Sequence, residues 1–186
     1  MSLNTDELAQ LLGVTGAGIP PVDAISETFP RRHAVSTAYA PATGVLQMFG
    51  IYLPANKTIT NINFVSGGTA EATGTNLWFA LYDQNLNLLA QSTNDTGATS
   101  FAANTNLRKA LTAAQTTKYA GLYYVGYMMT AGTMTTLLCL AAPASSVANG
   151  IVPIIAATSS TGLTTTAPNP AAALVVQVNT AYAYVS

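Results

Sequence analysis

Residues 44–64 read GVLQMFGIYLPANKTITNINF, and this stretch indicates the fold class. Aliphatic, aromatic and β-branched residues dominate 45–53 and 58–65, and the turn formers Pro54-Ala55-Asn56-Lys57 separate the two runs. In 45–53 both alternating sets of side chains are largely apolar, which is typical of a strand that is covered on both faces. We therefore expect two strands joined by a tight turn within a buried sheet.

The chain from about Val35 onward repeats this pattern of short β-forming runs between turn residues, which is the signature of an all-β sandwich or barrel. The strands expected are 34–40, 45–53, 58–65, 76–82, 87–92, 121–129, 134–140 and 174–185. The turn at Asp83-Gln84-Asn85 predicts a hairpin between two of them. Residues 93–118 and 145–170 lack a clean period, so we expect surface connections there, with a helical turn near 106–114.

The N-terminal segment 1–30 differs from the rest of the chain. Asn4 is suited to cap a helix, and Gly13 is suited to end it two or three turns later. A helix this short is marginal alone, so its apolar face needs a docking surface. That face comprises Leu3, Leu8, Leu11 and Leu12. We expect an attachment arm over 1–30, with a Gly/Pro linker, and an antiparallel, jelly-roll-like β-sandwich over 31–186.

Charge is scarce and unevenly placed. Only 7% of the residues are charged, against about 25% in an ordinary soluble protein. The whole segment 119–186 has no charged side chain. Because a free monomer normally keeps interspersed surface charge, this last third is expected to be buried against copies of itself or neighbours. A net charge of -1 without a basic cluster argues against nucleic-acid binding.

The residues that carry chemistry are few. No apolar run reaches the roughly 18 residues of a membrane span, so no membrane partner is expected. With His33 the only histidine and Cys139 the only cysteine, a zinc site within one chain and an internal disulfide are excluded, and assembly in a reducing cytoplasm fits. We expect a solvated or structural His33, a buried, inert Cys139, and no cofactor.

Carboxylates offer two further hypotheses. Calcium could be held at Asp83-Gln84-Asn85 or at Asn94-Asp95, although Asp and Asn also favour turns for backbone reasons. A glycosidase needs two carboxylates across a cleft, and the sandwich region has only Glu71, Asp83 and Asp95, with no pair singled out. The turn interpretation is favoured, and no metal and no catalytic residue are expected.

One aromatic set could recognise sugars by stacking, with neighbouring Asn and Thr as hydrogen-bonding groups. It consists of Trp78, Tyr119, Tyr123, Tyr124 and Tyr127. Strand alternation places Tyr123 and Tyr127 on one face and Tyr124 on the other, so at least one face is interior. Packing in the core is the favoured use of these rings, and a glycan platform is the alternative.

Three runs together resemble a known family. They are 44–64, quoted above, 75–83 (TNLWFALYD) and 119–127 (YAGLYYVGY). They resemble the β-sandwich modules of virion accessory proteins of tailed bacteriophages, especially those infecting actinobacteria. The resemblance covers roughly 31–186, and Asn56 stands where the pattern more often has Gly. It implies a capsid-decorating, head-fibre or minor-tail component, often a homotrimer, attached to the particle by its N-terminal segment.

These observations lead to three hypotheses about function. The first is a non-enzymatic capsid decoration or minor capsid protein on the outer virion surface, assembled in the host cytoplasm, with major capsid or tail proteins as partners. The second is a minor-tail or fibre-tip module that binds a host cell-surface glycan through the aromatic set. The third, a hydrolase of the cell envelope, would need Glu71, Asp83 or Asp95.

Overall fold

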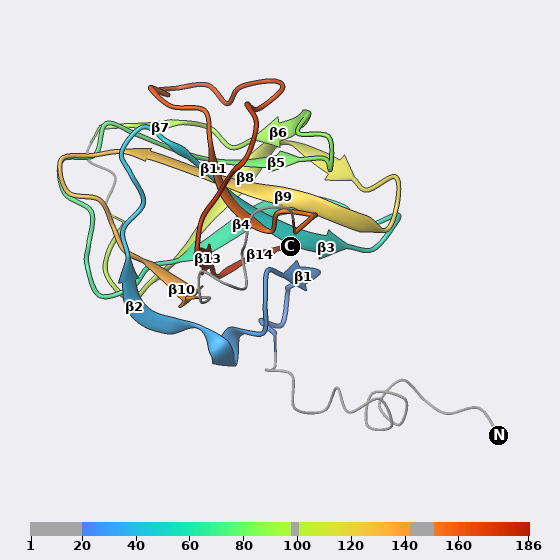
Figure 1. Cartoon of the computed structure of the whole chain (residues 1–186), viewed down its shortest axis with the longest axis horizontal. Helices are drawn as coiled ribbons and strands as arrows, with labels where there is room; N and C mark the ends of the chain where they lie inside the picture. Colours follow the sequence, from blue (N-terminus) through green and yellow to red (C-terminus); the bar gives the residue numbers. More distant parts are fainter. Residues whose placement is uncertain (1–19, 98–100, 142–150) are drawn as a thin grey trace.

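The computed structural model describes residues 20–97, 101–141 and 151–186, which form an antiparallel β-sandwich (Figure 1). The expected all-β sandwich is therefore confirmed. The expected N-terminal helix, with Leu3, Leu8, Leu11 and Leu12, lies outside the described residues.

The described part of the chain contains fourteen strands and one 3-10 helix. They are β1 Ser26–Glu27, η1 Arg31–His33, β2 Val35–Tyr39, β3 Leu46–Leu53, β4 Thr58–Val65, β5 Asn76–Tyr82, β6 Leu88–Gln91, β7 Asp95–Thr96, β8 Asn106–Thr116, β9 Gly121–Thr130, β10 Leu137–Ala141, β11 Ala156–Ser159, β12 Val175–Val176, β13 Asn179–Ala181 and β14 Ala183–Val185.

These strands form one large sheet and two smaller ones. The seven-stranded sheet has the order β12-β11-β3-β9-β5-β6, with β7 also paired to β5. The others have the orders β1-β14-β4-β8 and β13-β10-β2, and a bridge from Ser66 to Leu137 links them into an opposing layer. A second bridge, from Ser92 to Leu111, joins the two layers beside β6 and β8.

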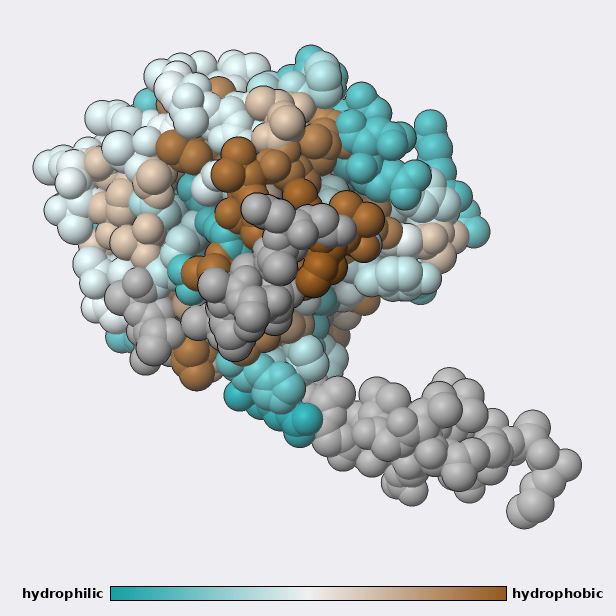
Figure 2. Space-filling model, viewed as in Figure 1, coloured by the Kyte–Doolittle hydropathy of each residue, from teal (hydrophilic) through white to brown (hydrophobic). Residues whose placement is uncertain are grey.

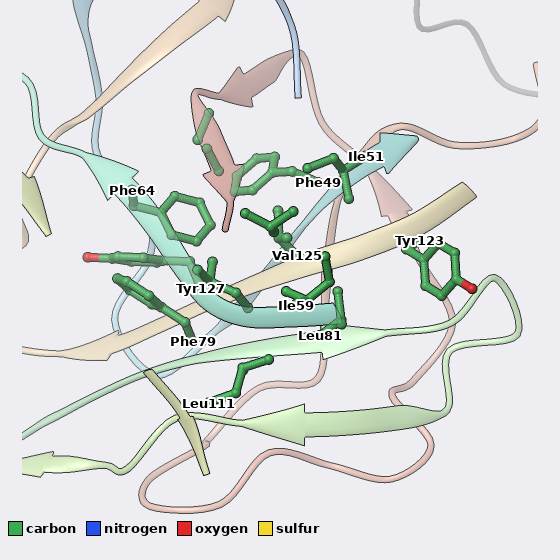
Figure 3. Packing of buried hydrophobic residues seen from close by; sticks show 14 of the residues in the cluster. Phe49, Ile51, Ile59, Phe64, Phe79, Leu81, Leu111, Tyr123, Val125 and Tyr127 are labelled. Carbon is green, nitrogen blue, oxygen red and sulfur yellow. The ribbon is translucent and has the colours of Figure 1, made fainter. Parts of the chain in front are cut away.

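The inner core lies between these layers and is centred on four aromatic rings (Figure 3). The Phe64 ring from the smaller layer lies 4.8 Å from Phe79, 5.4 Å from Tyr127 and 6.0 Å from Phe49, centroid to centroid. These spacings are those of edge-to-face and tilted aromatic pairs, which add to the burial of apolar area. The inner core therefore ties β4 to β3, β5 and β9.

The outer face of the seven-stranded sheet carries a second core. It contains Leu46, Met48, Trp78, Tyr82 and Tyr124, all at most 3% exposed. Residues 160–174, which we call the cover segment, supply Ala167, Ala171 and the partly buried Leu163 and Leu174 to it. The prediction that strand 45–53 is covered on both faces is confirmed over most of its length, and Tyr52 near its end is 64% exposed.

The long central strands match their predicted ranges closely, whereas two predicted connections were wrong. Residues 106–116 form β8, which pairs with β4, rather than a connection with a helical turn. Lys109 occupies a buried position of β8, 9% exposed, so a charge interrupts the apolar alternation that marks a strand. Residues 156–159, expected in a loose segment, form β11 against β3.

The ends of the chain also differ from the expectation. The expected strand 174–185 is three short strands, β12, β13 and β14, and each belongs to a different sheet. Strand β1 lies inside the range assigned to the arm, yet it pairs with β14. The backbone N–H groups of Ile25 and Thr28 extend this pairing by donating to the carbonyls of Val185 and Ala183. The sandwich thus begins several residues before position 31.

Candidate functional site

The proposed aromatic platform for sugars is almost entirely buried. Trp78 and Tyr127 are 0% exposed, Tyr123 is 2% and Tyr124 is 3%. The predicted alternation is confirmed, with Tyr123 and Tyr127 in the inner core and Tyr124 in the outer core. Because both faces of the sheet are covered, these four rings cannot stack on a sugar, and that part of the glycan hypothesis was wrong.

Trp78 holds the cover segment in place instead. Its indole Nε1 donates to the Thr164 carbonyl at 2.9 Å, and the Tyr82 hydroxyl donates to the Pro168 carbonyl at 3.2 Å. The Gln91 amide adds two bonds, since it donates to the Thr165 carbonyl and accepts from the Ala167 N–H. Buried aromatic rings with polar tips need such partners. The outer aromatic residues therefore serve intramolecular packing.

Burial extends the pH range over which these phenols stay protonated. Removal from water raises the pKa of Tyr82 and of Tyr127 above the ordinary value, because the charged phenolate is poorly solvated there. Burial is also the main cause of the raised pKa of Tyr182, whose hydroxyl donates to Glu27 Oε2 at 2.9 Å. Each phenol is thus a stable hydrogen-bond donor at neutral pH.

Each of the three carboxylates considered for catalysis has a structural partner. Asp83 accepts from the backbone N–H groups of Asn85 and Asn87, which closes the β5–β6 hairpin. Glu71 accepts from the N–H groups of Gly74 and Phe101 and so fixes a loop. These contacts confirm the turn role of Asp83, and the carboxylates come from separate loops and strands.

Asp95 faces a cation supplied by the protein itself. Lys109 Nζ lies 2.5 Å from Asp95 Oδ2, and the lysine side chain is 9% exposed. An ammonium group at this position disfavours a calcium ion on Asn94-Asp95. Within the described residues, no group of three or more His, Cys, Asp or Glu side chains is placed to hold a metal.

His33 and Cys139 lie in different settings. His33 is exposed on η1 at the surface of the sandwich, where its Nε2 accepts from Arg32 Nε. Cys139 is 1% exposed on β10, as expected for an inert thiol. No described helix is long and apolar enough to cross a membrane.

The most unusual surface lies at the β12 edge of the seven-stranded sheet. Six large hydrophobic side chains of the described residues are more than half exposed. Apart from Val22, they are Tyr52 (64%), Ile151 (56%), Val152 (79%), Ile155 (53%) and Val175 (64%). We call residues 151–155, Val175, Val176 and Tyr52 the apolar edge surface. Figure 2 shows hydrophobic residues gathered at the middle of this view, over the region of β11.

The backbone of this surface is fixed to the sheet. The Ile155 carbonyl accepts from the Gly50 N–H at 2.8 Å, and the Ile154 carbonyl accepts from the Tyr124 hydroxyl at 2.8 Å. A Cβ added at Gly50 would lie 3.3 Å from the Ile155 Cα, so glycine permits this close approach. These hydrogen bonds fix the backbone at Ile154 and Ile155 to the sheet. The side chains of Ile151, Val152 and Ile155 are more than half exposed there.

A shallow groove runs through the apolar edge surface. Its volume is about 250 Å³, and its lining residues are all apolar: Ile151, Val152, Pro153, Ile154, Ile155, Ala156 and Val176. Such a surface can bury aliphatic side chains of a partner, and its lining supplies no side chain that could act as an acid, a base or a nucleophile.

A second, polar hollow of about 170 Å³ lies beside the N-terminal end of β9. Asp83, Gln115, Lys118 and Tyr119 contribute to it. The ring of Tyr119, which is partly exposed, stacks on Tyr123 at 4.9 Å between centroids. Tyr123 also lines this hollow but is only 2% exposed, so Tyr119 is the most exposed member of the predicted aromatic set.

Comparison with models of known protein families and with curated proteins gives no match to this chain.

Proposed function

We propose that this protein is a non-enzymatic structural component of a tailed-phage virion, a capsid decoration or minor capsid protein on the outer surface. The apolar edge surface carries the proposal. It belongs largely to the charge-free segment 119–186, and contiguous exposed apolar surface of this kind typically marks a contact with another protein. The resemblance of 44–64, 75–83 and 119–127 to virion accessory modules supplies the identity of the particle.

The energetic reason for assembly is the exposed apolar area. Burial of apolar area contributes about 25 cal/mol per Å², which is about 1.5–3 kcal/mol for a Val, Leu or Ile side chain that passes from full exposure to full burial. Four aliphatic side chains and Tyr52 are each more than half exposed in the apolar edge surface. A homo-oligomer, with a trimer favoured by the resemblance, would remove them from water.

The start of the described chain suits an attachment arm. Residues 25–28 are hydrogen-bonded to β14, and Asp23 Oδ2 accepts from Arg108 Nη1 at 2.6 Å. Residues 23–28 are thereby tied to the smaller layer, where major capsid or tail proteins are the proposed partners. An arm joined to a fixed strand can transmit a docking contact to the whole sandwich.

Deletion of residues 1–19 tests this role. We expect the truncated chain to fold but to be missing from purified particles, whereas full-length chain is incorporated. The deletion stops before residue 20 because removal of 1–30 would also remove β1 from its sheet. Circular dichroism and thermal unfolding control for folding. Particles that carry normal amounts of the truncated chain would contradict the arm's role.

A second candidate function is recognition of a host cell-surface glycan by a minor-tail or fibre-tip module. The observation in its favour is the polar hollow, where the Tyr119 ring lies beside Asp83, Gln115 and Lys118. A glycan array and a cell pull-down with purified protein test it, with Tyr119→Ala as the variant expected to lose binding and Tyr119→Phe, which keeps the ring, as the matched control. No binding by the native chain would exclude this candidate.

A further inference from the structure

The apolar edge surface is also the place where the seven-stranded sheet ends. Strand β12 has β11 on one side, and no described strand pairs with its other side. Proteins normally cover, charge or shorten such edges to prevent uncontrolled pairing. Here the edge is short but uncharged, and Val175 is exposed on it. Ile151, Val152 and Ile155, which line the groove beside Val176, are exposed as well. An unpaired edge next to exposed apolar side chains is normally covered by another chain or segment.

We infer that the cover is another copy of this chain, so that the apolar edge surface is the contact between protomers. The inference deepens the proposed function, on which it rests for the expectation of an oligomer. It assigns the contact to 151–155, 175–176 and Tyr52. It leaves the cover segment, which packs on its own sheet, outside that contact.

Charge favours a second copy over a charged partner. Residues 119–186 contain no charged side chain, so two copies that meet through this region neither repel one another nor bury an uncompensated charge there. An acidic or basic partner would find no countercharge among them. A partner with the same apolar character matches the surface, and a copy of the chain provides one.

The exposed area also fits a contact between folded chains. A fully exposed aliphatic side chain offers on the order of 100 Å² of apolar area, taken from about 1.5–3 kcal/mol at about 25 cal/mol per Å². Five side chains exposed by between 53% and 79% therefore supply roughly 300–400 Å². Each partner of a standard interface buries about 800 Å², a little more than half of it apolar. The surface thus has the size of an interface core.

Multi-angle light scattering on the full-length chain tests the inference. The native chain should have the mass of two or more chains of 19.1 kDa at micromolar concentration. The double variant Ile151→Glu, Val175→Glu should have the mass of one chain, because four or more carboxylates would meet in the contact. Ala110→Glu is the matched control, since it adds a carboxylate at an exposed position of β8 in the smaller layer and should keep the native mass.

Hydrogen exchange on the native chain provides a second measurement that needs no variant. Amides of 151–156 and 175–178 should gain protection as protein concentration rises from nanomolar to micromolar, while those of β8 should not change. A native chain of single mass, or a double variant that remains folded and associated, would overturn the inference.

The outcome is separable from the fate of the proposed function. A native chain that is monomeric in solution, but whose double variant fails to enter particles, would assign the apolar edge surface to another virion protein. That result would overturn the self-contact and leave the structural role in the virion standing. An oligomer that is absent from particles would support the self-contact and contradict the structural role in the virion.

Discussion

The two faces of the seven-stranded sheet are covered in different ways. The inner face packs against regular strands, and rings from both layers, such as Phe64 and Phe79, lie against one another. The outer face is covered by the irregular cover segment, which Trp78 and Tyr82 hold by hydrogen bonds to backbone carbonyls. The charge-free segment 119–186 therefore contains two kinds of surface. Part of the charge-free third covers its own sheet, and the apolar edge surface remains exposed.

The largest expected effect lies in the inner core. Phe64→Ala removes a 0% exposed ring that contacts three others, so we expect a loss of about 3–5 kcal/mol in the free energy of unfolding. Urea denaturation measures it. Phe64→Leu should cost clearly less, because it keeps most of the volume. A loss below about 1 kcal/mol for Phe64→Ala would mean that the inner core does not dominate stability.

An outer-face change should act more locally. Trp78→Phe removes the donor of the part-buried hydrogen bond to the Thr164 carbonyl and leaves a small void in the outer core, so we expect a loss of about 1–3 kcal/mol. Hydrogen exchange should accelerate in 160–174 while β3 and β9 keep their protection. Tyr82→Phe, which removes only the bond to Pro168, is the milder control. Uniform acceleration across the whole sandwich would show that the two faces unfold as one unit.

Alkaline pH should weaken both faces. The pKa values of Tyr127 in the inner core and Tyr82 in the outer core are raised by burial above the ordinary value of 10.0. The folded state therefore holds these protons more tightly than the unfolded state, and its stability is complete below pH 10 and falls as pH rises above it. Each phenol should cost about 1.4 kcal/mol per pH unit. Denaturation midpoints at pH 8, 10 and 11 measure this fall, which Tyr82→Phe should reduce.

The smallest effect is expected outside both faces. The ion pair between Arg108 and Asp23 is short, but its side chains are 48% and 44% exposed. Solvent screening limits such pairs, so Arg108→Ala should change the free energy of unfolding by about 0.5 kcal/mol or less. Thermal unfolding in low and high salt checks it. A loss above about 2 kcal/mol would mean that this contact fixes the first strand more strongly than its exposure indicates.

Local pattern was enough to predict β3, β4, β5 and β9, but not β8. The two apolar sets in 45–53 correspond to the two covered faces of β3, and the alternation of Tyr123, Tyr124 and Tyr127 correctly divided them between the cores. The sequence could not show what covers the outer face, because the Thr- and Ala-rich cover segment has no period of its own. Its place depends on bonds between residues far apart in the chain, such as Trp78 and Thr164.

The candidate site was only partly predictable. Lack of charge singled out the last third, which contains most of the apolar edge surface, but it did not separate the cover segment from that surface. The aromatic set was considered as a sugar platform because aromatic rings can stack on sugars. Whether each ring is buried depends on the neighbouring strands, which residue type alone does not show. Strand β8 was not predicted because Lys109 places a charge at one of its buried positions. That charge is compensated by Asp95 on β7, a separate strand that no local pattern connects with Lys109.

The most direct test of the central claim is cryo-electron microscopy of purified virions assembled in cells that produce this chain. We predict repeated density for the sandwich on the outer capsid surface, with the apolar edge surfaces of neighbouring copies in contact. A few copies at a fibre tip would favour the glycan-binding alternative. Complete absence of the chain from purified particles would contradict a structural role in the virion.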